Sequence, residues 1–404
     1  MKLSEELEWR GFKAQNTFGN MAELDERPRK FYWGADPSMD SLTIGNLAAM
    51  MMVYCFKKHG HKPYLLVGGA TGQIGDPKET EERQLKSLEE VERNKAGIAA
   101  QIKRILGADE DLAVVDNYDW FKDIGYLEFL REVGKQFSMT QLLDREFVKA
   151  RIGEGGAGLS YAEFSYSLIQ GYDFLHLYRE YGVDLQLCGA DQFGNCVSGM
   201  HLIKRLEDGK ADVWSTPLVI DKVSGRKFGK SEGNAVWLDE KRTSVYSFYQ
   251  FWLNLDDEGV DYYMKIYTTM GRDEVDEVLA RHGENPSERI AQKTIAREVT
   301  KIVHGAEKAK VAERLTEVLF GGVKLAELSL DEYELLRAEI PSVEEGKNLT
   351  DVLVESGEAT SKGEARRLMA GGAVSVDGEK VLEDKVITQR CLVKKGKNRF
   401  VIVD

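Results

Sequence analysis

Residues 63–77 read PYLLVGGATGQIGDP, an unbroken apolar run that ends in a glycine-rich turn. Four further apolar runs are separated by helix-length segments: residues 30–34, 112–116, 183–187 and 217–220. Continuous apolar runs of this kind indicate parallel strands that are covered on both faces. We therefore predict a doubly wound, parallel, Rossmann-type α/β domain over residues 1–220, with a connective insertion.

The rest of the chain is predicted to divide into smaller parts. Residues 221–243 form a loop and linker, and residues 244–320 form an α-helical domain, because strand candidates are few there and residues 287–304 are amphipathic. Residues 321–347 are expected to be a linker that could carry short helices. Residues 348–404 alternate helix, turn and strand signals and predict a small α+β module.

Composition excludes several classes of protein. The chain has 404 residues, and its longest apolar stretch, residues 42–56, is interrupted by Asn46 and is too short for a bilayer span. The first residues lack a secretory apolar region, so we expect a cytoplasmic protein without a membrane segment. The four cysteines show no Cys-x-x-Cys spacing and no neighbouring histidine cluster, which predicts reduced thiols and no structural metal site.

The formal net charge of −13 is unevenly distributed along the chain. Residues 349–404 hold ten Lys and Arg against nine Asp and Glu, so the acidic excess lies in the preceding residues. An acidic body that carries a near-neutral module with clustered bases is compatible with local RNA contact, because only the contacted face must be positive.

The glycine-rich turn after the strand at residues 63–68 is a candidate ligand loop. It has four glycines in eight residues, which costs folding entropy unless the backbone must approach something closely or adopt positive φ angles. The embedded Thr71, Gln73 and Asp76 favour a loop that lines a ligand over a merely flexible connection.

Residues 36–46, DPSMDSLTIGN, follow the first predicted strand and open an apolar helix. In doubly wound sheets ligands bind at the carboxyl ends of the strands, where a helix N-terminus offers free N–H groups to phosphate. Gly45 would let a nucleotide lie close to the backbone. The alternative is an Asp-Pro loop with ordinary helix capping.

Two further segments carry polar groups into otherwise apolar surroundings. On the helix predicted over residues 161–174, Tyr166, Gln170 and Asp173 share one face, which indicates either a bound ligand or a solvated polar stripe. Residues 186–195 run from a strand into a turn and a helix, where Asp191 could bind ribose hydroxyls or simply cap the helix.

The pentapeptide at residues 227–231, KFGKS, follows the apolar run at 217–220. Two ammonium groups on a glycine-hinged loop suit a polyphosphate that gains charge as it leaves. Taken alone the pentapeptide is a weak signal, because a lysine-rich surface turn is the ordinary explanation of such a string.

These segments, in this order, resemble the bacterial type of tyrosyl-tRNA synthetase, a family of class I aminoacyl-tRNA synthetases. The resemblance covers essentially the whole chain and includes residues 117–120, NYDW, and residues 243–252. It implies that the phenol of a tyrosine substrate lies at Tyr32 and Asp173. The amino group would meet Asp76, Tyr166 and Gln170, and the carboxyl group would lie near Gln192.

The resemblance also implies a nucleotide site and a catalytic set. ATP would contact Asp36, Ser38, Gly45, Gly189, Asp191, Leu218, Val219 and Lys230. The catalytic groups would be Thr43, Asn46, Lys227, Lys230 and Ser231. Relatives usually carry His-Ile-Gly-His where residues 43–46 read TIGN, and Thr43 and Asn46 keep a hydroxyl and an amide donor in place of the two imidazoles. Trp33 stands where relatives carry a small residue.

The implied reaction has two steps and needs no enzyme nucleophile. The carboxylate of tyrosine attacks the α-phosphorus of ATP, with Mg²⁺ arriving with ATP, and the terminal adenosine of tRNA(Tyr) then accepts the tyrosyl group. The resemblance implies a homodimer with Tyr161 as an interface candidate, an ordinary core tyrosine being the alternative. Residues 348–404 resemble a small RNA-binding module, with six candidate contacts: Lys362, Arg366, Arg367, Lys394, Lys395 and Lys397.

Two other functions remain open from the sequence. A tryptophan-specific ligase of the same class is disfavoured by the Tyr32 and Asp173 pair, which suits a phenol. An RNA-binding paralogue without aminoacylation is suggested by Thr43 and Asn46. The retained Asp76, Asp191, Lys227 and Lys230 argue against that second alternative.

Overall fold

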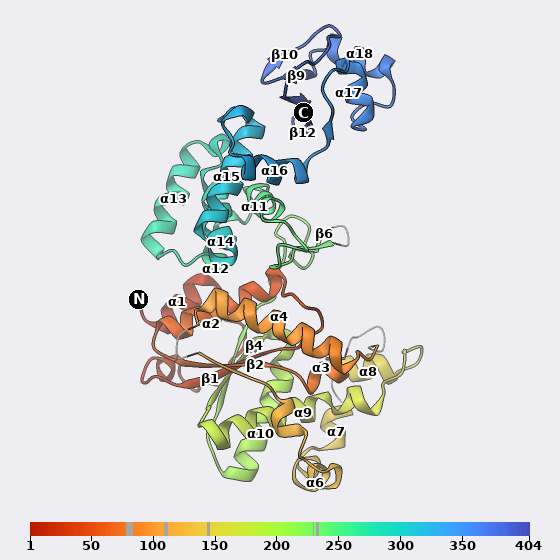
Figure 1. Ribbon diagram of the computed structural model, residues 1–404. Coiled ribbons are helices and arrows are strands. Elements are labelled where there is room, and N and C mark those ends of the chain that lie inside the picture. The colour runs from red at the N-terminus through yellow and green to blue at the C-terminus, as the bar shows by residue number, and fades with distance from the viewer. Residues whose placement is uncertain (78–83, 109–111, 144–145, 229, 232–233) are drawn as a thin grey trace. The chain divides into compact units, whose positions relative to one another are not determined.

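The computed structural model describes residues 1–77, 84–108, 112–143, 146–228, 230–231 and 234–404 (Figure 1). These residues form two compact units. Unit 1 comprises Met1–Thr243 and Leu255–Ala291, and unit 2 comprises Ser244–Asn254 and Gln292–Asp404. A search of the described helices for one that is both long and apolar enough to cross a bilayer finds none.

Unit 1 is built on a five-stranded sheet in the order β3-β2-β1-β4-β5, and every neighbouring pair is parallel. The strands are β1 (Lys30–Ala35), β2 (Lys62–Val67), β3 (Ala113–Val115), β4 (Leu185–Gly189) and β5 (Asp212–Thr216). Helices α2 (Ile44–Lys58) and α4 (Leu88–Leu106) lie on one side of the sheet, and α9 (Tyr161–Tyr181) and α10 (Phe193–Glu207) lie on the other (Figure 1). The predicted doubly wound α/β fold is confirmed.

Shorter elements complete unit 1. Before and between the strands lie α1 (Leu3–Arg10), η1 (Met21–Leu24), α3 (Thr71–Ile74) and η3 (Ala190–Gln192). The connective insertion between β3 and α9 contains α5 (Tyr118–Phe121), α6 (Tyr126–Glu132), η2 (Gly134–Gln136), α7 (Met139–Leu143) and α8 (Glu146–Ile152). After β5 come β6 (Lys230–Ser231), β7 (Asn234–Ala235), α12 (Val260–Tyr267), α13 (Arg272–Glu284) and η4 (Pro286–Glu288).

The fifth strand lies one segment earlier than predicted. The apolar run at residues 217–220 is not a strand of the sheet, and β5 ends at Thr216 instead. Pro217 has no N–H group to continue the ladder of hydrogen bonds. Leu218 and Ile220, which follow it in the chain, are exposed. The residues that fill the core are Val213 and Trp214, which are fully buried.

The region predicted as one helical domain, residues 244–320, is divided between the two units. Helix α12 belongs to unit 1 because Arg10 on α1 binds its C-terminal end. The guanidinium of Arg10 donates to the carbonyl oxygens of Lys265, Thr268 and Met270 at 2.6, 2.9 and 2.8 Å. Glu6 pairs with Arg10 at 2.9 Å and holds the guanidinium in place. The C-terminal end of α12 is thereby fixed to the first helix of the chain.

Unit 2 joins helices to a second sheet. Its helical elements are α11 (Val245–Leu253), α14 (Ile290–His304), α15 (Ala306–Phe320), η5 (Leu325–Glu327), α16 (Leu330–Glu339), α17 (Leu349–Glu355) and α18 (Lys362–Ala370). The sheet order is β10-β9-β11-β12-β8, formed by β8 (Ser342–Val343), β9 (Val374–Val376), β10 (Glu379–Lys380), β11 (Cys391–Lys395) and β12 (Arg399–Val403).

The segment predicted as a linker, residues 321–347, is packed into the core of unit 2. Leu336 on α16 is buried in one cluster with Leu392 on β11 and Ile402 on β12. The hydroxyl of Tyr333 also donates to the Asp404 carboxylate at 2.8 Å. The linker expectation is therefore corrected, because α16 has an apolar face that packs against the strands.

Candidate active site

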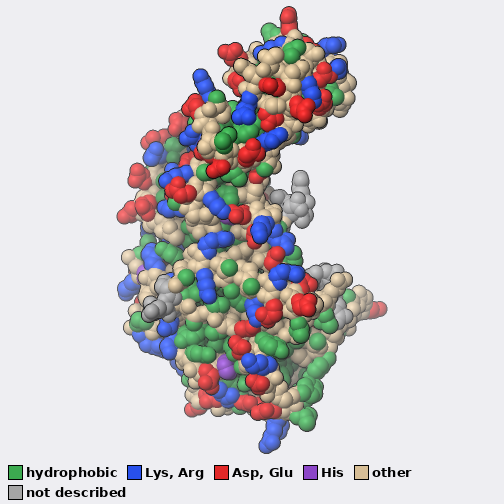
Figure 2. Space-filling model, in the orientation of Figure 1, with side chains coloured by type: hydrophobic (Ala, Val, Ile, Leu, Met, Phe, Trp, Pro, Cys, Tyr) green, Lys and Arg blue, Asp and Glu red, His purple; other side chains and the backbone are tan. Residues whose placement is uncertain are grey.

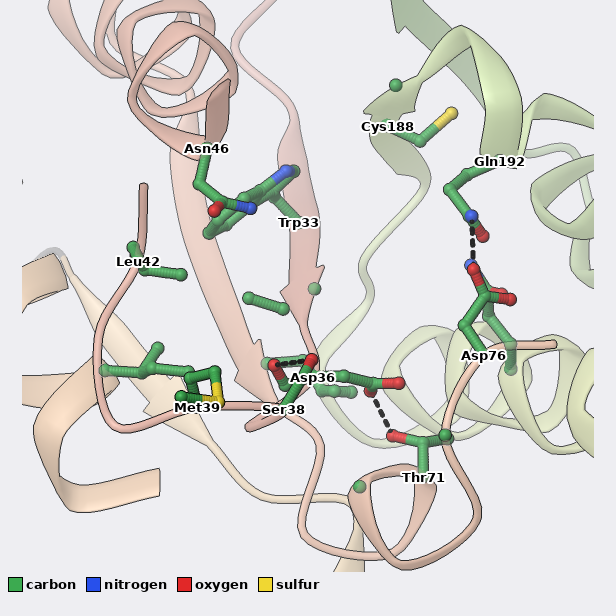
Figure 3. Close-up of a pocket in the computed structure, with 18 of the residues that line it drawn as sticks. Trp33, Asp36, Ser38, Met39, Leu42, Asn46, Thr71, Asp76, Cys188 and Gln192 are labelled. Carbon is green, nitrogen blue, oxygen red and sulfur yellow. Dashed lines mark hydrogen bonds between the residues drawn. The ribbon is translucent and has the colours of Figure 1, made fainter. Parts of the chain in front are cut away.

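A cavity of ≈ 400 Å³ lies at the carboxyl ends of β1 and β4 (Figure 3). Here the strand order reverses, since the chain passes from β1 to β2 on one side and reaches β4 on the other. Parallel sheets bind their ligands at this kind of point, where no crossover connection covers the crevice. The cavity walls come from β1, the loop after it, the glycine-rich turn, α9 and β4.

The predicted phenol pair meets at one end of this cavity. Tyr32 and Asp173 both line it, and each side chain is about 2% exposed. The hydroxyl of Tyr32 makes no hydrogen bond of good geometry with the described residues, although the Gln186 side chain lies near enough to oppose the rise in its pKa. Burial raises the pKa of Tyr32 well above its usual value, so the hydroxyl stays protonated and can donate to a ligand.

Asp173 is held from behind by two side chains of the connective insertion. The indole N–H of Trp120 donates to Oδ1 at 3.0 Å, and the amide of Asn117 donates to Oδ2 at 3.1 Å. Burial raises the pKa of Asp173 well above its usual range, and these two hydrogen bonds act in the opposite direction. The sequence assigned no role to Asn117 or Trp120, because contacts between distant segments leave no periodic signal.

Two glutamines add acceptors to the same wall. The side-chain carbonyl oxygens of Gln170 and Gln186 are buried and have no partner within the described part of the chain. Gln186 lies on β4 directly opposite Tyr32 in the strand register, and it was not among the predicted site residues. Buried polar atoms without partners are costly, so this set indicates a polar ligand.

Carboxylates gather next to this wall. Asp36 accepts hydrogen bonds from the hydroxyls of Thr71 and Tyr166, both at 2.7 Å. Asp76 accepts one from the Gln192 amide at 2.9 Å, and both acidic side chains appear in Figure 3. Burial first, and then the charges of Asp36 and Asp76, raise the pKa of Tyr166 well above its usual value. Two carboxylates around one hydroxyl suit an ammonium group.

The other end of the cavity is formed by the N-terminus of α2. The Oδ1 atom of Asn46 accepts hydrogen bonds from the backbone N–H and the hydroxyl of Thr43, both at 3.0 Å. These two residues therefore cap their own helix. Both line the cavity with Ser38, and Asn46 lies beside Trp33 (Figure 3). With its oxygen used in the cap, Asn46 has its amide N–H groups to offer a ligand.

Other predicted nucleotide contacts lie at the rim or beyond it. Gly189 lines the cavity, and a Cβ there would lie 2.6 Å from the carboxylate of Asp191 and 3.8 Å from Leu218. Asp191, Leu218 and Lys227 are exposed, and they do not line the cavity; nor do Gly45 and Val219. Lys230 and Ser231 form β6, but their side chains and all of Gly229 are outside the described residues.

The candidate RNA contacts in unit 2 fall into two groups. Lys362, Arg366, Arg367 and Lys397 are exposed, although Lys362 pairs with Asp351 at 2.5 Å. The other two make internal contacts: the Lys394 ammonium lies over the rings of Phe320 and Phe400, and Lys395 pairs with Glu358. On the face shown in Figure 2, basic and acidic side chains are interspersed.

The predicted interface residue, Tyr161, begins α9 directly after the connective insertion. Tyr161 is 60% exposed, so it is not a core tyrosine, and its hydroxyl accepts a hydrogen bond from Tyr126 at 3.5 Å. Leu127, Met139 and Ile152 of the same insertion are exposed as well.

No group of three or more potential metal ligands is found among the described His, Cys, Asp and Glu side chains.

Comparison with known proteins gives matches along the chain. The family described as class I tRNA synthetases (W and Y) matches residues 24–321, and the tyrosine–tRNA ligase SYY-like C-terminal domain matches residues 332–403. The tyrosine–tRNA ligase of Leuconostoc citreum is 41% identical, with 100% of this chain and 99% of that protein covered. Tyrosine–tRNA ligase 2 of Bacillus cereus is 40% identical, with the same coverage.

Solved structures give the same picture. A C-terminally truncated mitochondrial tyrosyl-tRNA synthetase of Coccidioides posadasii superposes with a TM-score of 0.68 and 29% identity, covering 78% of this chain and 91% of that one. A tryptophanyl-tRNA synthetase of Encephalitozoon cuniculi bound to tryptophan gives 0.56 and 13%, covering 83% and 92%. The second likeness is one of fold alone.

Proposed function

This chain belongs to the class I tRNA synthetases of the tryptophan and tyrosine group and is an aminoacyl-tRNA ligase, and we propose that its amino acid is L-tyrosine. The observation that carries the choice is the buried wall formed by Tyr32, Gln186 and Asp173. A phenol can donate to the Asp173 carboxylate and accept from the Tyr32 hydroxyl. Phenylalanine would leave the buried Tyr32 hydroxyl without a ligand partner and Asp173 with only its two donors from Asn117 and Trp120, which is the costlier outcome.

The remaining groups of the cavity suit the backbone of an amino acid. The ammonium group would lie between Asp76, Tyr166 and Gln170, where the two carboxylates that flank Tyr166 supply negative charge. The carboxylate would lie near the Gln192 amide. This arrangement points the carboxylate away from the phenol end and toward the N-terminus of α2.

The first proposed step is an in-line displacement. A carboxylate oxygen of tyrosine attacks the α-phosphorus of ATP, the bond from that phosphorus to the bridging oxygen breaks, and pyrophosphate leaves with the electron pair. The Asn46 amide and the ammonium groups of the lysine motif would donate to the phosphate oxygens as charge develops on them, and the Thr43 hydroxyl would join them by turning from its bond to Asn46. Mg²⁺ would be bound through the phosphates of ATP.

In the second proposed step, a hydroxyl of the terminal adenosine of tRNA(Tyr) attacks the tyrosyl carbonyl carbon and AMP leaves. We assign tRNA binding in unit 2 to the exposed Lys362, Arg366, Arg367 and Lys397. We assign homodimer formation to the exposed apolar side chains of the connective insertion together with Tyr161 at the start of α9. Because the reaction is a step of protein synthesis, we expect it in the cytoplasm.

Exchange of labelled pyrophosphate into ATP tests this function directly. We expect exchange that depends on tyrosine, with phenylalanine and tryptophan giving little. Faster exchange with tryptophan than with tyrosine would identify tryptophan as the substrate. The protein should first be shown to be folded by circular dichroism. If it then binds tRNA but shows no amino-acid-dependent exchange, the ligase assignment is wrong and the RNA-binding paralogue is favoured.

A further inference from the structure

Helix α4 presents a row of three residues to the loop that precedes α2. Asn94, Gly97 and Gln101 are three and four positions apart and therefore share one face. The Asn94 amide donates to the carbonyl oxygen of Pro37 at 3.0 Å. A Cβ at Gly97 would collide with the carbonyl oxygen of Asp40, so the helix and the loop touch through backbone. This face of α4 fixes the course of the loop.

Gln101 makes the contacts nearest to the start of α2. Its side-chain oxygen accepts a hydrogen bond from the backbone N–H of Leu42 at 2.9 Å, and its amide nitrogen donates to the hydroxyl of Ser41 at 3.0 Å. Gln101 and Ser41 are each about 4% exposed. Since both ends of the Gln101 amide are used on consecutive residues, Gln101 holds the backbone just before Thr43 at two adjacent points.

Ser41 and Leu42 carry these contacts on to a distant segment. The Ser41 hydroxyl accepts a hydrogen bond from the backbone N–H of Asp239 at 3.1 Å, and the Leu42 carbonyl oxygen accepts one from Leu238 at 2.9 Å. The N–H of Ile44 donates to the carbonyl oxygen of Val236 at 3.1 Å. Residues 42–44 and 236–238 therefore run side by side as a short ladder that Gln101 backs from one side.

The second strand of this ladder continues directly from β7, which pairs with β6, so Val236 lies five residues after Ser231 of the lysine motif. The first strand ends in Thr43 and Asn46, which line the cavity (Figure 3). The ladder thus joins two parts of the chain to which the proposed function gives the same task, namely holding phosphate oxygens.

We propose that Gln101 is a positioning residue that sets residues 236–239 against the N-terminus of α2 and thereby aligns the two phosphate-binding parts of the site. It touches no substrate, and it acts through Ser41 and Leu42. The role rests on the proposed function, since alignment matters only if both parts meet the same ATP. Misplacing reacting groups by about 1 Å costs on the order of 100-fold in rate.

The test variant is Gln101→Met, which keeps the length of the side chain and removes both hydrogen bonds. We expect kcat for tyrosine-dependent pyrophosphate exchange to fall about 10- to 100-fold. The KM for tyrosine should stay within about twofold, because the amino-acid wall is untouched. Ser41→Ala should shift kcat in the same direction, and the double variant should lose less than the product of the two single losses, because both act through one contact.

The matched control is Gln250→Met in unit 2, where the same substitution removes a glutamine hydrogen bond to Thr316 of 2.6 Å. It should lower thermal stability and leave kcat unchanged. A Gln101→Met protein with wild-type kcat, or with a raised tyrosine KM as its main change, would overturn the proposal.

Hydrogen–deuterium exchange separates this proposal from the function on which it rests. In Gln101→Met the amides of Leu238 and Asp239 should exchange faster, together with those of Leu42 and Ile44, whether or not the wild-type protein activates tyrosine. Unchanged protection across residues 236–239 would refute the positioning role. An inactive wild-type protein in which Gln101→Met still loosens both segments would instead refute the function and keep the ladder.

Discussion

The two ends of the cavity are built on opposite plans. At the phenol end, Tyr32 and Gln186 hold buried polar atoms that have no partner in the described protein, and Asn117 and Trp120 brace the Asp173 carboxylate. At the nucleotide end, Thr43 and Asn46 bond to each other, and Lys227 and Asp191 are exposed. Under the proposed function, amino-acid choice would rest on a site formed before binding, whereas phosphate contacts would be completed by surface groups.

The strongest way to break this comparison is to remove the carboxylate of the phenol end. Asp173→Ala leaves the donors of Asn117 and Trp120 unsatisfied and deletes the acceptor for the phenol. We expect kcat/KM for tyrosine to fall about 30- to 1,000-fold, which corresponds to about 2–4 kcal/mol. The KM for ATP should hardly change, and both are measured by pyrophosphate exchange.

The control for that variant is Asp119→Ala, a neighbouring carboxylate whose side chain is 70% exposed. It should behave as the wild type does. Equal losses for tyrosine and ATP in Asp173→Ala would mean that the two ends of the cavity are not independent.

A second change acts on the nucleotide end through charge alone. In Lys227→Ala we expect kcat for exchange to fall about 10- to 100-fold with the KM for tyrosine unchanged, because the ammonium is proposed to act on the leaving pyrophosphate. Lys204→Ala on α10, an exposed lysine that pairs with Asp208, is the matched control. A raised KM for tyrosine in Lys227→Ala would show that this lysine acts on the amino acid and not on the nucleotide.

Asn46 tests whether helix capping and ligand contact are separate tasks at that end. Asn46→Ala removes the cap and should cost about 1 kcal/mol of unfolding free energy, with a smaller loss of rate than Lys227→Ala. Asn46→Asp keeps the acceptor for Thr43 and adds a favourable charge at the helix start, but it has no N–H to donate. It should match the wild type in urea unfolding and be slower in exchange than Asn46→Ala.

The smallest expected effect concerns stability and pH. The folded-state pKa of Asp173 is raised above its ordinary 3.8, so above that pH the folded protein holds this proton more tightly than the unfolded chain does. Stability is therefore lost as pH rises from about 4 toward the raised pKa. Asp173→Asn should gain stability relative to the wild type as the pH rises above about 4 in ligand-free urea unfolding. A difference that is constant with pH would contradict this.

The sequence was a good guide to what lies on one element and a poor guide to what meets between elements. The spacing of Tyr166, Gln170 and Asp173 predicts that they share one face of a helix, and in the structure all three line the cavity. The run at residues 217–220 has the apolar character of a strand, and that character alone does not reveal that the ladder of β5 has already ended at Thr216. The sequence predicts a linker at residues 321–347 because the many charges there hide the buried face of α16.

The same limit explains the missed site residues. Gln186 falls on a predicted strand, and its direction toward Tyr32 depends on a strand register that needs both strands. Gln101 and Ser41 are 60 positions apart in the chain and meet only because α4 passes the loop before α2. No property of either segment alone gives that contact.

The burial of α16 against β11 and β12 has a practical consequence for dissecting the chain. Cutting at residue 347 would strip Leu392, Phe400 and Ile402 of the helices that cover them and leave Asp404 without Tyr333. A polypeptide made that way would expose a hydrophobic patch and would tend to self-associate. Fragments intended for RNA titrations should begin before Ala306, so that α15 and α16 travel with the strands they shield.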